Sequence, residues 1–353
     1  MNARIALVLV VLLVALGGGA LLYNYQERTQ KADNTAALGK ALLNVKVADV
    51  ATIKITEPKA TLTLKRQGDG WVIAERRNFP ADITRVREFG LKLIDLKVGQ
   101  SEPIGDKDRA RLNLDASGTQ VELAAADGKP LAKLTVGKKY FKREVENPDK
   151  ALADGRFVAI PAEAGTVYTV SDPLAQATTK TADWIDRTSF QIEKVKTLEV
   201  KIPSGDAWRV ERTKDDADWK LAGAKPGEKL EVTKANAASY SLSLLELADV
   251  LPKDTADTGL DKPVEISAVT LDGLTYDIKV GKLQGDNYFV TFASSGTIKP
   301  DAKDAERTKK LEERQPREKL LQNYVLLIPK GRLEDTLRKR SEFLEKKEQK
   351  KKK

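Results

Sequence analysis

Apolar and polar residues alternate in two stretches of the chain that resemble each other. Residues 49–55 and 194–200 both alternate in this way, which is typical of a strand with one buried face. A second alternating stretch follows each, at 61–66 and at 208–212, and a polar turn comes after it. We therefore predict two antiparallel meanders of one kind, roughly 145 residues apart.

A short stretch beginning with tryptophan follows each polar turn, at Trp71 and at Trp219. Because large aromatic side chains at matched positions usually anchor a core, we expect both tryptophans to be buried, with a ligand platform as the alternative.

Helical spacing of apolar residues comes next in both copies. In the first copy it predicts a helix over 82–96, with Asp82 as the N-cap after Pro80. In the second copy it predicts a helix over 233–251, which Pro252 ends.

Two hairpins with Asp-Gly turns follow the helices. The turns are Asp127-Gly128 and Asp272-Gly273, and each hairpin ends in the sequence Val-Gly-Lys. A further strand at 156–160 matches one at 287–291. Each copy is expected to close with an Arg-Ser/Thr-x-Phe sequence that ends at Phe190 or Phe343.

These patterns predict an α+β protein with two tandem repeats, each an antiparallel sheet with one main helix. The predicted segments are an anchor at 1–25, a tether at 26–46, a first repeat at 47–190, a second repeat at 191–343 and a basic tail at 344–353. A charged insertion at 294–322, broken at Pro316, distinguishes the second repeat. A solvated surface excursion is its simplest interpretation, and a partner-binding hairpin is the alternative.

The predicted anchor is an uncharged, mostly apolar run of 19 residues from Ile5 to Tyr23. At 1.5 Å per residue, such a helix is about as long as the hydrocarbon core is thick. Arg4 precedes the run, which favours a single span with the N-terminus in the cytoplasm and the body outside the inner membrane. A cleaved signal peptide is the alternative, although the run is long for one and Ala15-Leu16-Gly17 is a poor cleavage site.

The positive charge lies at the C-terminal end. The chain has 61 Lys/Arg and 52 Asp/Glu, a net charge of +9. Residues 299–353 contain 19 Lys/Arg and 11 Asp/Glu, so they carry +8 of that charge and the rest of the chain carries +1. A nucleic-acid partner is therefore not indicated, because the folded body is nearly neutral.

The absence of histidine and cysteine excludes several chemistries. A Ser-His-Asp triad, a thiol nucleophile and a Cys/His zinc site are all impossible. No GxxxxGK[ST] phosphate loop is present. The acidic residues Asp215, Asp216 and Asp218, like those of 106–108, fit turns or solvated loops. We predict no catalytic, cofactor-binding or metal-binding residue.

The chain resembles a bacterial family, domain of unknown function 4340, from Val47 to Phe343. The residues that carry the resemblance are Asp49-Val50 with Ile53, Gly70-Trp71, Trp184-Ile185-Asp186-Arg187, Gly259 to Pro263, and Asp272-Gly273 with Val280-Gly281-Lys282. The resemblance implies a single-span protein with extracytoplasmic domains. It also implies association with ABC transporters similar to the Gld gliding-motility systems.

Three functional hypotheses remain open at this point. The first is a non-enzymatic accessory or scaffold subunit, with an ABC transporter permease or another membrane protein as its partner. The second is a module that binds an envelope polymer or anionic lipid through the basic tail. The third is a glycan hydrolase that uses two carboxylates.

Overall fold

The computed structural model describes residues 38–163, 165–252, 254–299 and 304–345. By its internal contacts the chain divides between Trp184 and Ile185 into two compact units. We refer to them as the first unit, up to residue 184, and the second unit, from residue 185.

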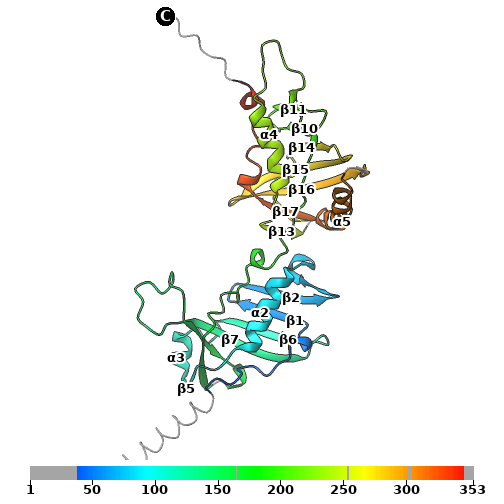
Figure 1. Ribbon diagram of the computed structural model, residues 1–353. Helices are drawn as coiled ribbons and strands as arrows, with labels where there is room; N and C mark the ends of the chain where they lie inside the picture. Colours follow the sequence, from blue (N-terminus) through cyan, green and yellow to red (C-terminus); the bar gives the residue numbers. More distant parts are fainter. Residues whose placement is uncertain (1–37, 164, 253, 300–303, 346–353) are drawn as a thin grey trace, which may run out of the picture. The chain divides into compact units, whose positions relative to one another are not determined.

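The described part of the first unit forms one nine-stranded sheet in which the strands pair antiparallel (Figure 1). Its strands are β1 (Thr52–Glu57), β2 (Ala60–Gln67), β3 (Gly70–Ile73), β4 (Phe79–Pro80), β5 (Gln100–Pro103), β6 (Thr119–Ala124), β7 (Pro130–Tyr140), β8 (Gly155–Ala159) and β9 (Thr166–Val170). Its helices are α2 (Ile83–Asp95) and the short α3 (Asp106–Arg111).

The described part of the second unit forms an eight-stranded antiparallel sheet. Its strands are β10 (Val195–Lys201), β11 (Ala207–Glu211), β12 (Lys220–Leu221), β13 (Asp249–Pro252), β14 (Val264–Thr270), β15 (Leu274–Gln284), β16 (Asn287–Gly296) and β17 (Tyr324–Pro329). Its helices are α4 (Val232–Ser241) and α5 (Ala305–Leu321).

The two sheets have the same strand order. After the edge strand β4, the first sheet runs β3-β2-β1-β6-β7-β8-β9-β5, and the second runs β12-β11-β10-β14-β15-β16-β17-β13. The pairing registers also correspond, because Ile53 pairs with Leu64 as Leu198 pairs with Val210. Each position in one sheet therefore has a defined equivalent in the other.

Helix α2 has the bounds and the cap that the sequence predicts. The side chain of Asp82 accepts hydrogen bonds from the backbone N–H groups of Thr84 (2.9 Å) and Arg85 (3.2 Å). The helix buries Val86, Phe89 and Leu93, the spacing that places one apolar face on the sheet. Both Asp-Gly hairpins are likewise confirmed by the β6–β7 and β14–β15 registers.

The predicted second helix is too long. Helix α4 ends at Ser241, a 3₁₀ turn continues to Leu244, and the chain then enters strand β13. The N–H of Ala248 donates to the carbonyl of Leu327 (2.8 Å), and β13 pairs with β17. Leucines spaced for a helix also fit a buried strand, and pairing with β17 decides between the two.

Residues 305–321 of the charged insertion form a continuous helix, α5, that packs on the second unit and is not a solvated excursion. Residues 294–296 still belong to strand β16, and α5 runs unbroken through Pro316. The helix buries Leu311, Glu318 and Leu321 against the second unit. The prediction of a break at Pro316 is therefore wrong, because the loss of one backbone hydrogen bond is offset by this packing.

The boundary between the units falls at residue 184, earlier than the Arg-Ser/Thr-x-Phe motif suggests. Phe190 stacks on Phe292 with ring centroids 3.8 Å apart, so it belongs to the core of the second unit. The structural equivalent of Phe343 is Trp184. The carbonyl of Trp184 accepts from the N–H of Asp82 (2.8 Å), as that of Phe343 accepts from the N–H of Glu231 (2.8 Å).

The last residues of the predicted tether pack on the first unit. Leu42 and Leu43 are buried, and Ala41 bridges to Lys97. The predicted anchor at 1–25, residues 26–37 of the tether and residues 346–353 of the tail lie outside the described residues. Within the described ranges, no helix combines the length and the apolar character needed to cross a membrane.

Candidate binding grooves

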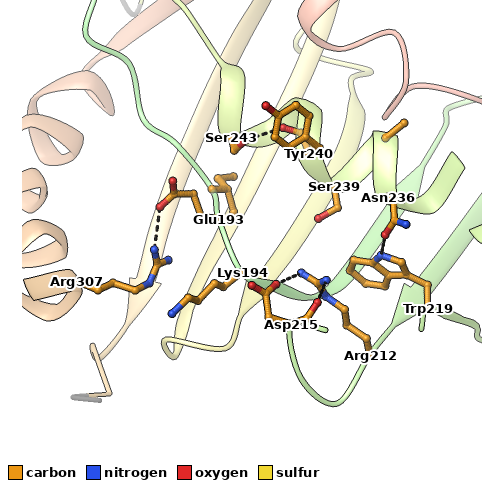
Figure 2. A pocket seen from close by; sticks show the side chains of 12 residues that line it. Glu193, Lys194, Arg212, Asp215, Trp219, Asn236, Ser239, Tyr240, Ser243 and Arg307 are labelled. Carbon is orange, nitrogen blue, oxygen red and sulfur yellow. Dashed lines mark hydrogen bonds and ion pairs between the residues drawn. The ribbon is translucent and has the colours of Figure 1, made fainter. Parts of the chain in front are cut away.

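Each unit has a groove beside its main helix, and the two grooves occupy equivalent places. The groove of the first unit, with a volume of about 400 Å³, lies between α2, the segment before β1 and the β2–β3 turn. The groove of the second unit, of about 660 Å³, lies between α4, the segment before β10, the β11–β12 turn and α5 (Figure 2).

The equivalence extends to single side chains. Eight pairs of equivalent residues line the two grooves, written with the residue of the first unit before that of the second: Val47/Ile192, Ala48/Glu193, Arg66/Arg212, Asp69/Asp215, Trp71/Trp219, Arg87/Asn236, Gly90/Ser239 and Ile94/Ser243. The backbone supports this alignment, since the N–H of Arg66 donates to Ala51 as that of Arg212 donates to Lys196. An arginine, an aspartate and a tryptophan from the turn are thus common to both grooves.

In the second unit these three residues form a fixed wall (Figure 2). The guanidinium of Arg212 lies 4.5 Å from the centre of the Trp219 ring and pairs with Asp215. Its Nε also donates to the carbonyl of Val195 (2.7 Å), and Trp219 Nε1 donates to Asn236 Oδ1 (2.9 Å). These contacts hold the wall before any ligand arrives, which reduces the entropy lost on binding.

The two tryptophans differ in burial. Trp219 is 3% exposed, so the prediction of a core anchor is confirmed there. Trp71 is only half-buried and lies along its groove, so the same prediction is wrong for the first unit. The β2–β3 turn places Trp71 within the strand, whereas Trp219 precedes β12.

The residues that line the two grooves differ outside the shared positions. Besides the shared positions, the first groove is lined by the apolar residues Val50, Ile53, Val86 and Leu123. Besides the shared positions, the second groove is lined by Lys194, Ala237, Tyr240 and Arg307. Equivalent positions therefore carry different side chains in the two grooves, although both grooves contain charged and apolar residues.

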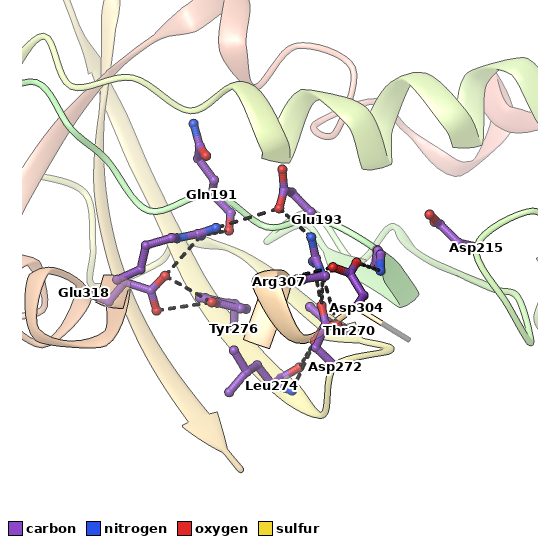
Figure 3. A network of polar contacts seen from close by, with 12 residues as sticks. Gln191, Glu193, Asp215, Thr270, Asp272, Leu274, Tyr276, Asp304, Arg307 and Glu318 are labelled. Atoms are coloured by element: carbon purple, nitrogen blue, oxygen red, sulfur yellow. Dashed lines mark hydrogen bonds and ion pairs between the residues drawn. The ribbon is translucent and has the colours of Figure 1, made fainter. Parts of the chain in front are cut away.

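Helix α5 supplies one side of the second groove through a network of charges (Figure 3). Arg307 bonds Asp272 with both its Nε (3.1 Å to either oxygen) and its Nη2 (2.6 Å), and its Nη1 bonds Glu193 (3.0 Å). These carboxylates raise the pKa of Arg307, so its charge is permanent.

A buried carboxylate anchors the other half of α5 (Figure 3). Both oxygens of Glu318 accept from the hydroxyl of Tyr276 (3.2 Å), and Arg314 lies 3.3 Å away. Burial raises the pKa of Glu318, and burial beside that carboxyl raises the pKa of Tyr276.

The acidic residues considered from the sequence do not come together as a site. Asp215 pairs with Arg212, Asp216 lies 3.2 Å from Lys214, and Asp108 lies 3.2 Å from Arg111. Among the described residues, no three metal-ligating side chains converge. Sequence reasoning missed both grooves, although Arg-x₂-Asp-x₁₋₃-Trp, present at 66–71 and at 212–219, was a signal that could have located them.

The fold and the grooves define a two-unit α+β protein with an equivalent groove beside the main helix of each unit. A family model, the domain of unknown function DUF4340, matches residues 71–263. This is more than half of the 353 residues, so the chain belongs to the DUF4340 family. The match begins in β3 and ends just before β14, so it covers parts of both units. Comparison with curated proteins and with solved structures gave no match.

Proposed function

We propose that this protein is a non-enzymatic, membrane-anchored accessory or scaffold subunit that holds partners in the two grooves. An ABC-type transport system is the proposed partner, through its permease or another membrane protein. The body stands in the periplasm or another extracytoplasmic space, and the run at 5–23 is the single-pass anchor in the inner membrane.

The observation that carries the proposal is the pair of equivalent grooves with different linings. A duplicated unit explains the shared strand order and the shared Arg-Asp-Trp wall. The lining positions differ between the copies, with Ala48 against Glu193 and Ile94 against Ser243, for example. A shared backbone arrangement with different side chains in the groove is expected where each copy recognises a different surface.

The charged groups of the second groove favour a binding role for this groove over a catalytic one. Arg212 and Arg307 are each compensated by carboxylates that hold them in place. Compensated, rigid side chains present hydrogen-bonding atoms at fixed positions, which favours recognition. A tether to the membrane would raise the effective concentration of the grooves near a membrane partner.

The alternative is a binding module for an envelope polymer or anionic lipid that uses the basic tail. Six lysines in residues 346–353 motivate it. Binding of this kind should weaken as the salt concentration rises, because it depends on surface charges.

Co-purification from native membranes tests the proposal, with variants that block one groove at a time. Ile94→Glu places a charge in the first groove, and Leu91→Glu is its control on the same helix, at an exposed position outside the lining. Ser243→Trp fills the second groove, and Leu244→Trp is its control. We expect the groove variants, and not the controls, to lose membrane proteins identified by mass spectrometry.

Three results would overturn or replace the proposal. If all four variants retain every partner, the grooves do not hold partners. If deleting residues 345–353 alone abolishes salt-sensitive binding to anionic polymer, the alternative replaces it. If one Asp or Glu substitution abolishes a measurable hydrolytic activity, the protein is an enzyme.

A further inference from the structure

A third pocket, in the first unit, gathers positive charge away from both grooves. It has a volume of about 370 Å³ and lies where β6, β7, β8 and the 141–154 loop meet. Its lining includes three cationic side chains and one acidic one, namely Lys138, Lys139, Arg156 and Asp149.

Arg156 is the central cation of this pocket. Its Nε donates to the carbonyl of Pro173 (2.7 Å), and its Nη1 donates to the carbonyl of Gly137 (3.0 Å). These carbonyls fix the guanidinium but do not neutralise it. Within the described part of the chain, Arg156 forms no ion pair, and burial lowers its pKa. A partly buried charge normally has a counter-charge, because desolvation without one is costly.

A second cation stands directly opposite Arg156 on the neighbouring strand. Lys139 pairs with Arg156 in the β7–β8 register, and like charges at such positions repel. The Nζ of Lys139 donates to the carbonyls of Pro148, Asp149 and Ala151 (2.8–3.0 Å), so it closes the 141–154 loop over the pocket. Again no carboxylate among the described residues pairs with it.

The second unit has no pair of cations at the equivalent position of its sheet. The equivalent cross-strand pair there is Leu283 with Tyr288, which carries no charge. The equivalent of Lys138 is Lys282, which forms an ion pair with Asp257. The fold therefore does not require a cross-strand pair of cations at this point, and the first unit has one despite the repulsion.

We propose that this pocket binds a phosphate-like oxyanion, which supplies the missing counter-charge. The guanidinium has N–H groups beyond the two that the carbonyls use, and a fork of such donors matches the oxygens of a phosphate. Lys138 and the side-chain amide of Asn113, both in the lining, are further donors. The source is either a soluble phosphate compound or a phospholipid headgroup.

The test measures binding to the full-length protein purified in a zwitterionic detergent. The probes are inorganic phosphate and dihexanoyl phosphatidylglycerol below its micellar concentration, titrated by calorimetry and by the rise in melting temperature. Arg156→Gln should weaken the binding of both probes about ten-fold or more, because it removes charged hydrogen bonds. Lys138→Ala, at an exposed position, should weaken it several-fold without affecting folding.

Lys282→Ala is the matched control, because it removes the equivalent lysine in the second unit. It should leave the binding of both probes unchanged. Tighter binding of the lipid than of phosphate assigns the pocket to a headgroup, and equal binding assigns it to a soluble phosphate compound.

Two results would overturn the proposal. One is that the unsubstituted protein binds neither probe. The other is that both Arg156→Gln and Lys138→Ala bind as tightly as the unsubstituted protein.

Discussion

The two units share one arrangement of strands and main helix, and they differ in the segments and side chains added to it. Strand order, hairpin registers and the groove beside the main helix are the same in both. The second unit has in addition a helix, α5, between β16 and β17, whereas β8 and β9 are joined by a short turn. The first unit has instead the long 141–154 loop and its cationic pocket. Insertions at different points of one frame thus give the two units different surfaces.

The largest loss of stability is expected at the buried aromatic residue near the C-terminal end of each unit. Trp184 and Phe343 are 1% and 0% exposed, and each packs near the start of its main helix. Trp184→Ala and Phe343→Ala should each lower the free energy of unfolding by about 3–5 kcal/mol. Hydrogen exchange resolved by unit should show the loss in the substituted unit. An equal loss in Trp71→Ala would contradict our assignment of Trp71 to the groove.

The next largest loss of stability should occur in the second unit alone. Arg307→Ala leaves Asp272, whose side chain is 11% exposed, without its bidentate partner. The expected loss is about 3 kcal/mol, because an uncompensated buried carboxylate is costly. Urea unfolding measures it, and Lys309→Ala, on the exposed face of α5, is the control. An unchanged midpoint in Arg307→Ala would mean that α5 is not fixed by these charges.

A moderate and equal effect is expected at a glycine that both units require. A Cβ at Gly137 would overlap the carbonyl oxygen of Leu112, and one at Gly281 would overlap that of Thr258. Gly137→Ala and Gly281→Ala should each cost about 1–3 kcal/mol in thermal unfolding. Gly331→Ala, where nothing lies within 4 Å, should cost nothing. Unequal losses at Gly137 and Gly281 would weaken the structural equivalence of the two units.

A smaller effect separates the caps of the two main helices. Asp82→Ala should cost about 1 kcal/mol, because it removes the two hydrogen bonds that cap α2. Glu231→Ala should cost less, because Glu231 makes no side-chain cap bond to α4. Chemical denaturation compares the two variants. A larger loss in Glu231→Ala would contradict this order.

The smallest effect concerns the stability of the second unit at acidic pH. Arg340 lowers the pKa of Glu228 to about 2, and the two side chains lie 2.7 Å apart. Since the folded-state pKa is below the ordinary value of 4.5, the pair stabilises the second unit above pH 4.5 and is lost as the pH falls through about 2. At the position equivalent to Arg340 the first unit has Thr181, whose hydroxyl accepts a hydrogen bond from Arg76 (2.7 Å) and does not titrate in this range. Glu228→Gln should therefore reduce the acid sensitivity of the second unit, measured by hydrogen exchange between pH 5 and 2.

The local elements were predictable because their signals are local. Asp82 lies where a helix N-cap is needed, and the glycines of both Asp-Gly turns have positive φ angles (83° at Gly128 and 89° at Gly273). Alternation placed β1 and β10 because each has one face on the core. These features depend on a few neighbouring residues, which the sequence displays directly.

The sites were not predictable, because their parts are distant in the chain. Arg307 binds Asp272 and Glu193, which lie 35 and 114 residues away from it in the sequence. No local sequence pattern predicts these contacts. The burial of each tryptophan also depends on distant residues that pack on it. The same motif therefore gave a buried tryptophan in one unit and a half-buried one in the other, although both line their grooves.

The sequence by itself determined two copies of an α+β unit, their hairpins and the caps and turns that start each element. Tertiary structure alone decided that Pro316 lies inside a continuous helix, that Leu251 extends a sheet and that the units divide at residue 184. It also decided that Arg156 is held by carbonyls with no described carboxylate beside it. The physical reason is that propensity acts between neighbours, whereas burial and charge compensation depend on which distant residues the sheet brings together.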